Sequence, residues 1–100
     1  MLLKDCEGKI IPENTTITLN ESYKNFRILL FKYRYGLTGM SYDVFFYPYM
    51  MRLNRYNLQA YAVTEYTVDT KLFFNSTTGN IDVTGHTTGG VYIDYIFGLR

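Results

Sequence analysis

The segment from Phe26 to Tyr35, FRILLFKYRY, constrains the fold more than any other part of the chain. Side chains along a β-strand point alternately to its two faces. Hydrophobic residues here occupy both faces, with Phe26, Ile28 and Leu30 on one and Leu29, Phe31, Tyr33 and Tyr35 on the other. Because both faces need cover, this pattern predicts a β domain that makes contacts beyond its own core.

Other short strand-like segments recur at roughly ten-residue intervals, with turn residues between them. Helical spacing is nearly absent. The expected strands cover residues 2–4, 16–19, 26–35, 42–53, 58–66, 67–74, 81–83 and 91–99, with a further short one at 9–11. Pro48 falls inside the 42–53 segment and marks an edge, a bulge or a short loop there. Residues 1–100 therefore predict one all-β domain, an antiparallel, jelly-roll-like β-sandwich of about seven or eight short strands.

Charge and cysteine content narrow the possible functions. The net charge is +1 and the basic residues are scattered, so the chain lacks the basic footprint of a nucleic-acid-binding protein. A single cysteine, Cys6, excludes an internal disulfide. No apolar run is long enough for membrane insertion, and the Lys4–Glu7 segment interrupts any signal-peptide core.

Residues that could carry catalysis are sparse. His86 is the only histidine, and its Thr- and Gly-rich surroundings predict an exposed loop. The carboxylates in the predicted strands occur singly, at Asp43, Glu65, Asp69, Asp82 and Asp94, although folding could gather two or three of them. We therefore expect no enzyme activity, no metal site and no cofactor.

The strongest binding candidates are aromatic. The chain has 11 Tyr and 7 Phe, and several of the tyrosines flank two predicted turns together with Arg and Asn. A flat aromatic face beside planar polar groups suits carbohydrate binding, whereas the same tyrosines could instead pack in the core or between subunits. The candidate ligand-binding residues are Tyr33, Tyr35, Tyr42, Tyr47, Tyr49, Arg52, Asn54, Arg55 and Tyr56.

The two ends of the chain carry a recognisable arrangement. Leu2–Leu3 precede an acidic, glycine-containing loop, then Thr16–Ser22 (TITLNES), Asn25–Phe26 and a long hydrophobic strand, and the chain closes on Tyr92–Gly98 (YIDYIFG). This resembles the C-terminal domains of tail-fibre, baseplate or other minor structural proteins of phages and prophages, notably from Gram-positive hosts. The resemblance covers about a third of the chain, at its two ends.

The resemblance implies a virion-associated tail module. It would be a homotrimer that recognises a host-surface glycan or other receptor alongside other tail proteins, and the family supplies no fixed catalytic residues to carry over. Weak sites repeated in a trimer would act through avidity. Two alternatives remain: a module that only trimerises and assembles a phage fibre, or a monomeric carbohydrate-binding module of a secreted enzyme.

Overall fold

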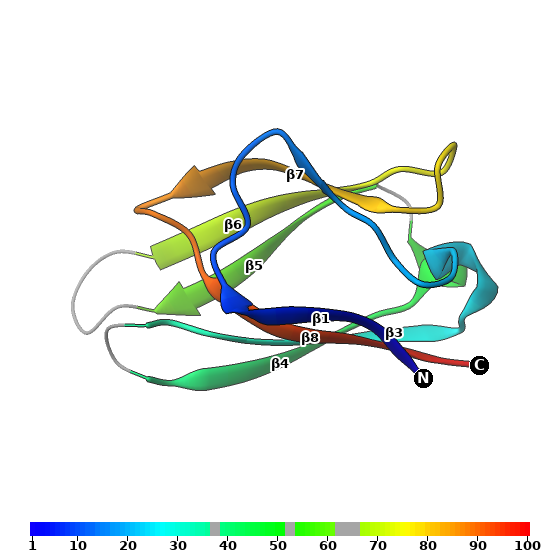
Figure 1. The fold of residues 1–100 in the computed structure, drawn as a ribbon, viewed down its shortest axis with the longest axis horizontal. Helices are drawn as coiled ribbons and strands as arrows, with labels where there is room; N and C mark the ends of the chain where they lie inside the picture. The colour runs from blue at the N-terminus through cyan, green and yellow to red at the C-terminus, as the bar shows by residue number, and fades with distance from the viewer. Residues whose placement is uncertain (37–38, 52–53, 62–66) are drawn as a thin grey trace.

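The protein is a two-layer β-sandwich, seen in the computed structural model that describes residues 1–36, 39–51, 54–61 and 67–100 (Figure 1). Within these residues, eight strands form two four-stranded antiparallel sheets. Sheet A contains, in spatial order, β1 (Leu2–Lys9), β8 (Tyr92–Leu99), β3 (Ile28–Arg34) and β4 (Ser41–Phe46). Sheet B contains β2 (Thr15–Ile17), β7 (Ile81–Thr87), β6 (Thr67–Phe74) and β5 (Arg55–Tyr61). The predicted all-β sandwich is confirmed.

The ends of the chain pair with each other in a nested, jelly-roll-like manner. β1 pairs with β8 in sheet A, and β2 pairs with β7 in sheet B. Between these nested pairs, β3 and β4 form a hairpin in sheet A, whereas β5, β6 and β7 follow one another in sheet B. Both termini therefore lie at the same end of the sandwich (Figure 1), where the Gly98 amide donates to the Met1 carbonyl at 2.8 Å.

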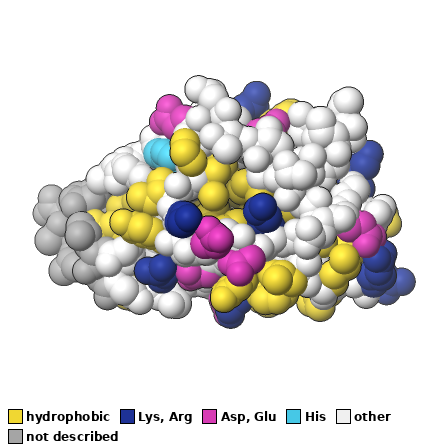
Figure 2. Space-filling view, viewed as in Figure 1, with side chains coloured by type: hydrophobic (Ala, Val, Ile, Leu, Met, Phe, Trp, Pro, Cys, Tyr) yellow, Lys and Arg dark blue, Asp and Glu magenta, His cyan; other side chains and the backbone are white. Residues whose placement is uncertain are grey.

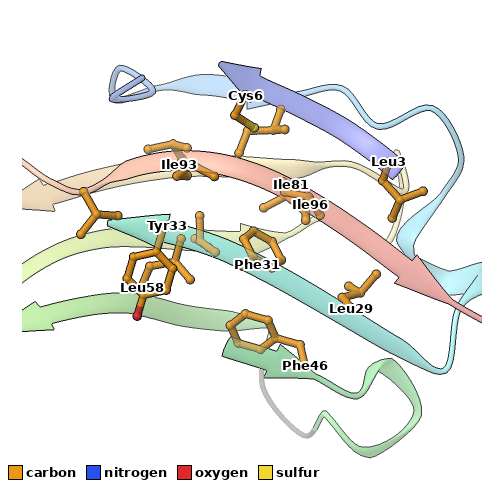
Figure 3. Packing of buried hydrophobic residues seen from close by; sticks show 14 of the residues in the cluster. Leu3, Cys6, Leu29, Phe31, Tyr33, Phe46, Leu58, Ile81, Ile93 and Ile96 are labelled. Carbon is orange, nitrogen blue, oxygen red and sulfur yellow. The ribbon is translucent and has the colours of Figure 1, made fainter. Parts of the chain in front are cut away.

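The core fills the space between the two sheets (Figure 3). Phe31 and Phe46 of sheet A lie edge-on to each other, with ring centroids 5.3 Å apart, and both contact Phe74 of sheet B. Burial of these large rings removes much apolar surface from water, at about 25 cal/mol per Å². The aromatic cluster is thus a main contact between the sheets.

The central strand β3 has the alternation that the sequence predicts. Leu29, Phe31 and Tyr33 are buried, whereas Ile28 and Leu30 on the other face are half-buried. Phe26 departs from the prediction: β3 begins at Ile28, and Phe26 lies fully buried after the short 3-10 helix η1 (Tyr23–Asn25) instead of sharing the outer face.

Several predicted strand bounds needed correction. The segment expected to run from 42 to 53 ends as β4 at Phe46, and the 3-10 helix η2 (Pro48–Met50) follows. Pro48 explains this break, because its fixed φ suits the first position of a helical turn and its nitrogen cannot donate in a ladder. β7 continues through residues 84–87, which the sequence predicted as loop, because these residues pair with β6.

Candidate binding surface

Two of the candidate tyrosines lie in the core. Tyr33 is 3% exposed and Tyr35 is 8% exposed, and Figure 3 shows Tyr33 among the core side chains. The Tyr33 hydroxyl donates to the Gln59 carbonyl of β5 at 2.6 Å, and its ring stacks on Tyr42 with centroids 5.4 Å apart. Tyr33 thus links sheet A to sheet B, and little of the Tyr33 and Tyr35 side chains is open to a ligand.

The remaining candidates are spread over the molecule. Tyr56 is half-buried and packs edge-on against Phe46 and Phe74, as a further part of the core. Asn54 and Arg55 are exposed, and the Arg55 guanidinium lies 5.1 Å from the Phe73 ring centroid. Arg52 lies outside the described residues. The predicted set is therefore not one continuous binding face among the residues that the structure describes.

The most exposed candidates surround η2. Tyr49 and Met50 are each 78% exposed, and Tyr47 is 45% exposed. The Met50 amide donates to the Tyr47 carbonyl at 2.8 Å, and Pro48 occupies the first position of this turn. Because Pro fixes φ, the turn holds the Tyr49 ring outward at a small cost in conformational entropy.

Tyr49 borders a hollow of about 280 Å³ that lies between the two 3-10 helices, η1 and η2, and the turn that joins β6 to β7. The lining residues are Tyr23, Lys24, Pro48, Tyr49 and Ser76. The Lys24 ammonium donates to the Ser76 carbonyl at 2.8 Å, so a cation is held beside an exposed aromatic ring. Tyr23, Lys24 and Ser76 were not predicted, because they are distant from Tyr49 in the sequence and only the fold brings them together.

A second hollow of about 280 Å³ lies on sheet A, where two of the candidate residues, Tyr33 and Tyr42, line it together with charged side chains. Lys32 of β3 contacts Asp43 of β4 at 3.0 Å, and Arg34 contacts Asp94 of the β8 bulge at 3.2 Å. Tyr95, which is 41% exposed, also lines this hollow. Ion pairs in such exposed settings contribute little to stability. The charges of these four groups compensate one another.

The predicted loop position of His86 is wrong. His86 lies in β7, half-buried, where its amide donates to Glu13 at 3.2 Å and Gly90 packs closely against its ring. Its Nε2 atom, like Oδ1 of Asp69, is buried without a hydrogen-bond partner among the described residues. The β6–β7 ladder runs through this position because Thr70 pairs with His86.

Acidic and thiol groups lie apart in the described part of the chain. No group of three His, Cys, Asp or Glu side chains there could hold a metal ion, and Glu65 lies outside it. Asp82 is hydrogen-bonded by Thr16 at 2.6 Å and by Asn75 at 3.2 Å, which accounts for both of its oxygens. Burial raises the pKa of the Cys6 thiol to about 11, so this group is a poor nucleophile at neutral pH.

Comparison of the chain with protein-family models, with curated proteins and with solved structures found no match. Among the residues that the structure describes, no helix has the length and apolar character needed to cross a membrane.

Proposed function

We propose that this chain is a non-enzymatic binding module at the tip of a phage tail fibre or baseplate appendage. In this role it acts as a homotrimer in the virion tail, beside other tail proteins, and contacts a carbohydrate on the host surface. The observation that carries the proposal is the exposed Tyr49 ring, held outward by η2 beside Lys24.

The chemistry of the Tyr49 hollow fits a sugar. A pyranose ring presents C–H groups on its flat faces and hydroxyls on its edge, so an aromatic face with adjacent hydrogen-bonding groups can bind both parts. The Lys24 ammonium and the backbone carbonyl of Ser76 supply a donor and an acceptor next to Tyr49. Such a shallow site binds weakly, and repetition over three chains and many appendages raises the avidity.

Binding of the purified chain to a glycan array, followed by cells of Gram-positive species, tests this function. We expect Tyr49→Ala to reduce the bound signal by more than about tenfold, which is the loss typical of an anchoring aromatic residue. Tyr49→Phe should retain most of the signal, because it keeps the ring face.

A chain that binds no glycan and no cell surface would contradict the adhesion proposal, as would equal binding by Tyr49→Ala and the unmodified chain. The matched control is Met40→Ala, at an exposed side chain without an aromatic ring that lines neither the Tyr49 hollow nor the hollow beside Phe45. If stacking on Tyr49 carries the binding, this change should have a much smaller effect.

A second candidate function is assembly alone, in which the domain only holds copies of a fibre chain together. It is favoured by a different observation, the row of apolar side chains across the outer face of sheet A. The apolar row on sheet A does not include Tyr49, so an oligomer that leaves the Tyr49 ring open could serve both functions.

A further inference from the structure

The outer face of sheet A carries a continuous apolar row that crosses all four strands. The cross-strand register pairs Leu2 of β1 with Phe97 of β8, Phe97 with Leu30 of β3, and Leu30 with Phe45 of β4. Phe45 is 50% exposed and Leu2 is 40% exposed. Directly opposed side chains in a sheet contact one another, so the four form a single strip.

The strip is widened on both sides. Toward the termini, Leu99 pairs with Ile28 and is 45% exposed. On the other side, the Tyr95 ring lies 5.8 Å from that of Phe97. We call this surface, made of Leu2, Ile28, Leu30, Phe45, Tyr95, Phe97 and Leu99, the apolar face. Figure 2 shows hydrophobic side chains gathered along the lower side of the molecule, beside acidic and basic ones.

The apolar face continues around the edge of the sandwich at Phe45. There a hollow of about 180 Å³ opens between β4 and β5, lined by Phe45, Phe46, Tyr47, Met50, Met51 and Tyr56. Met50 is 78% exposed, and flexible methionine side chains adapt readily to an apolar partner. The molecule therefore has two adjoining apolar surfaces, a face and an edge hollow, which meet at one residue.

We propose that the apolar face and the Phe45 edge hollow form the interface between copies of this chain. This deepens the proposed function, on which it rests, by naming the surface that joins the subunits of the tail-tip oligomer. A large exposed apolar patch with a polar rim marks an interaction site. Two different apolar surfaces on adjoining sides suit a head-to-tail contact, which closes into a ring when the rotation permits.

Charge favours a second copy as the occupant. The ionic groups beside the strip are compensated within the chain, Lys32 by Asp43 and Arg34 by Asp94. The face therefore offers little net attraction to a strongly acidic or basic partner, whereas the apolar edge hollow of a second copy meets it without like-charge repulsion.

The extent of the surface is also adequate. Four strands about 4.8 Å apart and about seven residues long give a face of roughly 19 by 24 Å. In projection this is about 460 Å², to which the edge hollow adds, so the contact falls at the small end of the interface range, which is adequate for association that depends on chain concentration.

Light scattering of the chain over a wide range of concentrations tests the interface. We expect the unmodified chain to reach the mass of a small closed oligomer, three copies if the homotrimer proposal is right. Phe45→Lys should weaken association by more than about tenfold, because it places a charge in the centre of an apolar contact. The matched control is Gln59→Lys, which adds the same charge to the exposed face of the other sheet's edge strand, β5.

Amide hydrogen exchange of the unmodified chain gives a second readout that does not depend on folding of the Phe45→Lys variant. Protection of β4 amides should rise with chain concentration, and protection of amides in β2, at the opposite edge of sheet B from β5, should not. A chain that stays monomeric at the highest concentration, or β4 exchange that is independent of concentration, overturns the proposed interface. Glycan-array binding by such a monomer would support the adhesion proposal and contradict the interface. An oligomer that binds no glycan would support the interface and contradict the adhesion proposal.

Discussion

At the scale of single residues, position 98 requires glycine because the Phe26 ring lies too close to its backbone for a Cβ atom. A Cβ atom at this position would lie 2.6 Å from Cδ1 of Phe26, whose ring is fully buried. The backbone conformation of Gly98 is not left-handed, so the requirement for glycine comes from space and not from φ. The Arg100 guanidinium also lies over the Phe26 ring, 4.8 Å from its centroid.

We expect Gly98→Ala to lower the free energy of unfolding by about 1–3 kcal/mol, the usual cost of overpacking a core. Gly85→Ala is the matched control, because a Cβ in that strand would meet its nearest neighbour at 3.7 Å, an ordinary contact. Urea unfolding of both variants provides the measurement. Equal stability of the two would show that the Phe26 ring can move aside.

At the scale of elements, β3 is the strand on which the two surfaces of sheet A depend. Its inner residues, Leu29, Phe31 and Tyr33, build the core, whereas Leu30 belongs to the apolar face. The hydroxyl of Tyr33 adds a polar link between the sheets through the Gln59 carbonyl. Tyr33, which the sequence suggested as a ligand contact, thus links β3 to β5 through a hydrogen bond.

Tyr33→Phe removes that tie while keeping the ring. We expect the free energy of unfolding to fall by about 1 kcal/mol, the net value of a typical hydrogen bond. Tyr95→Phe is the control, since Tyr95 is 41% exposed and removal of a hydroxyl from an exposed side chain costs little. Glycan binding should be unchanged in Tyr33→Phe. A loss of glycan binding with unchanged stability would instead make Tyr33 a ligand contact.

At the scale of the whole molecule, the nested pairing of the chain ends makes β1 part of the cooperative core. Leu3 and Cys6 of β1 are buried in the hydrophobic core, although β1 lies at the edge of sheet A. Burial raises the pKa of Cys6 from 9.0 to about 11 and raises that of Tyr23 as well. Both groups are therefore harder to ionise in the folded chain than in the unfolded one.

This difference predicts a loss of stability in alkali. The unfolded thiol ionises first, near pH 9, so its contribution to stability is complete below that pH and is lost as pH rises through about 11. The melting temperature should fall between about pH 9 and about pH 11, and it should fall less steeply in Cys6→Ala. Identical slopes for the two chains would remove Cys6 as the cause.

The sequence was sufficient to predict the fold class and most of the strands. Period-two alternation and turn residues are local properties, and strand β6, for example, was predicted at its observed bounds, Thr67–Phe74. Local patterns were less informative at Pro48, where the sequence allowed an edge, a bulge or a short loop and the structure has a 3-10 helix. They also failed at His86, because its place in β7 depends on pairing with Thr70 of β6.

Only the tertiary structure decided which aromatic faces are open. Alternation shows that Tyr33 and Tyr35 share a face, but whether that face meets water or the opposite sheet depends on segments distant in the chain. The same holds for Tyr49 beside Lys24 and for Phe45 at the end of the apolar strip. Burial is a property of packing between layers, so the sequence by itself determined the strands, and their packing determined the surfaces.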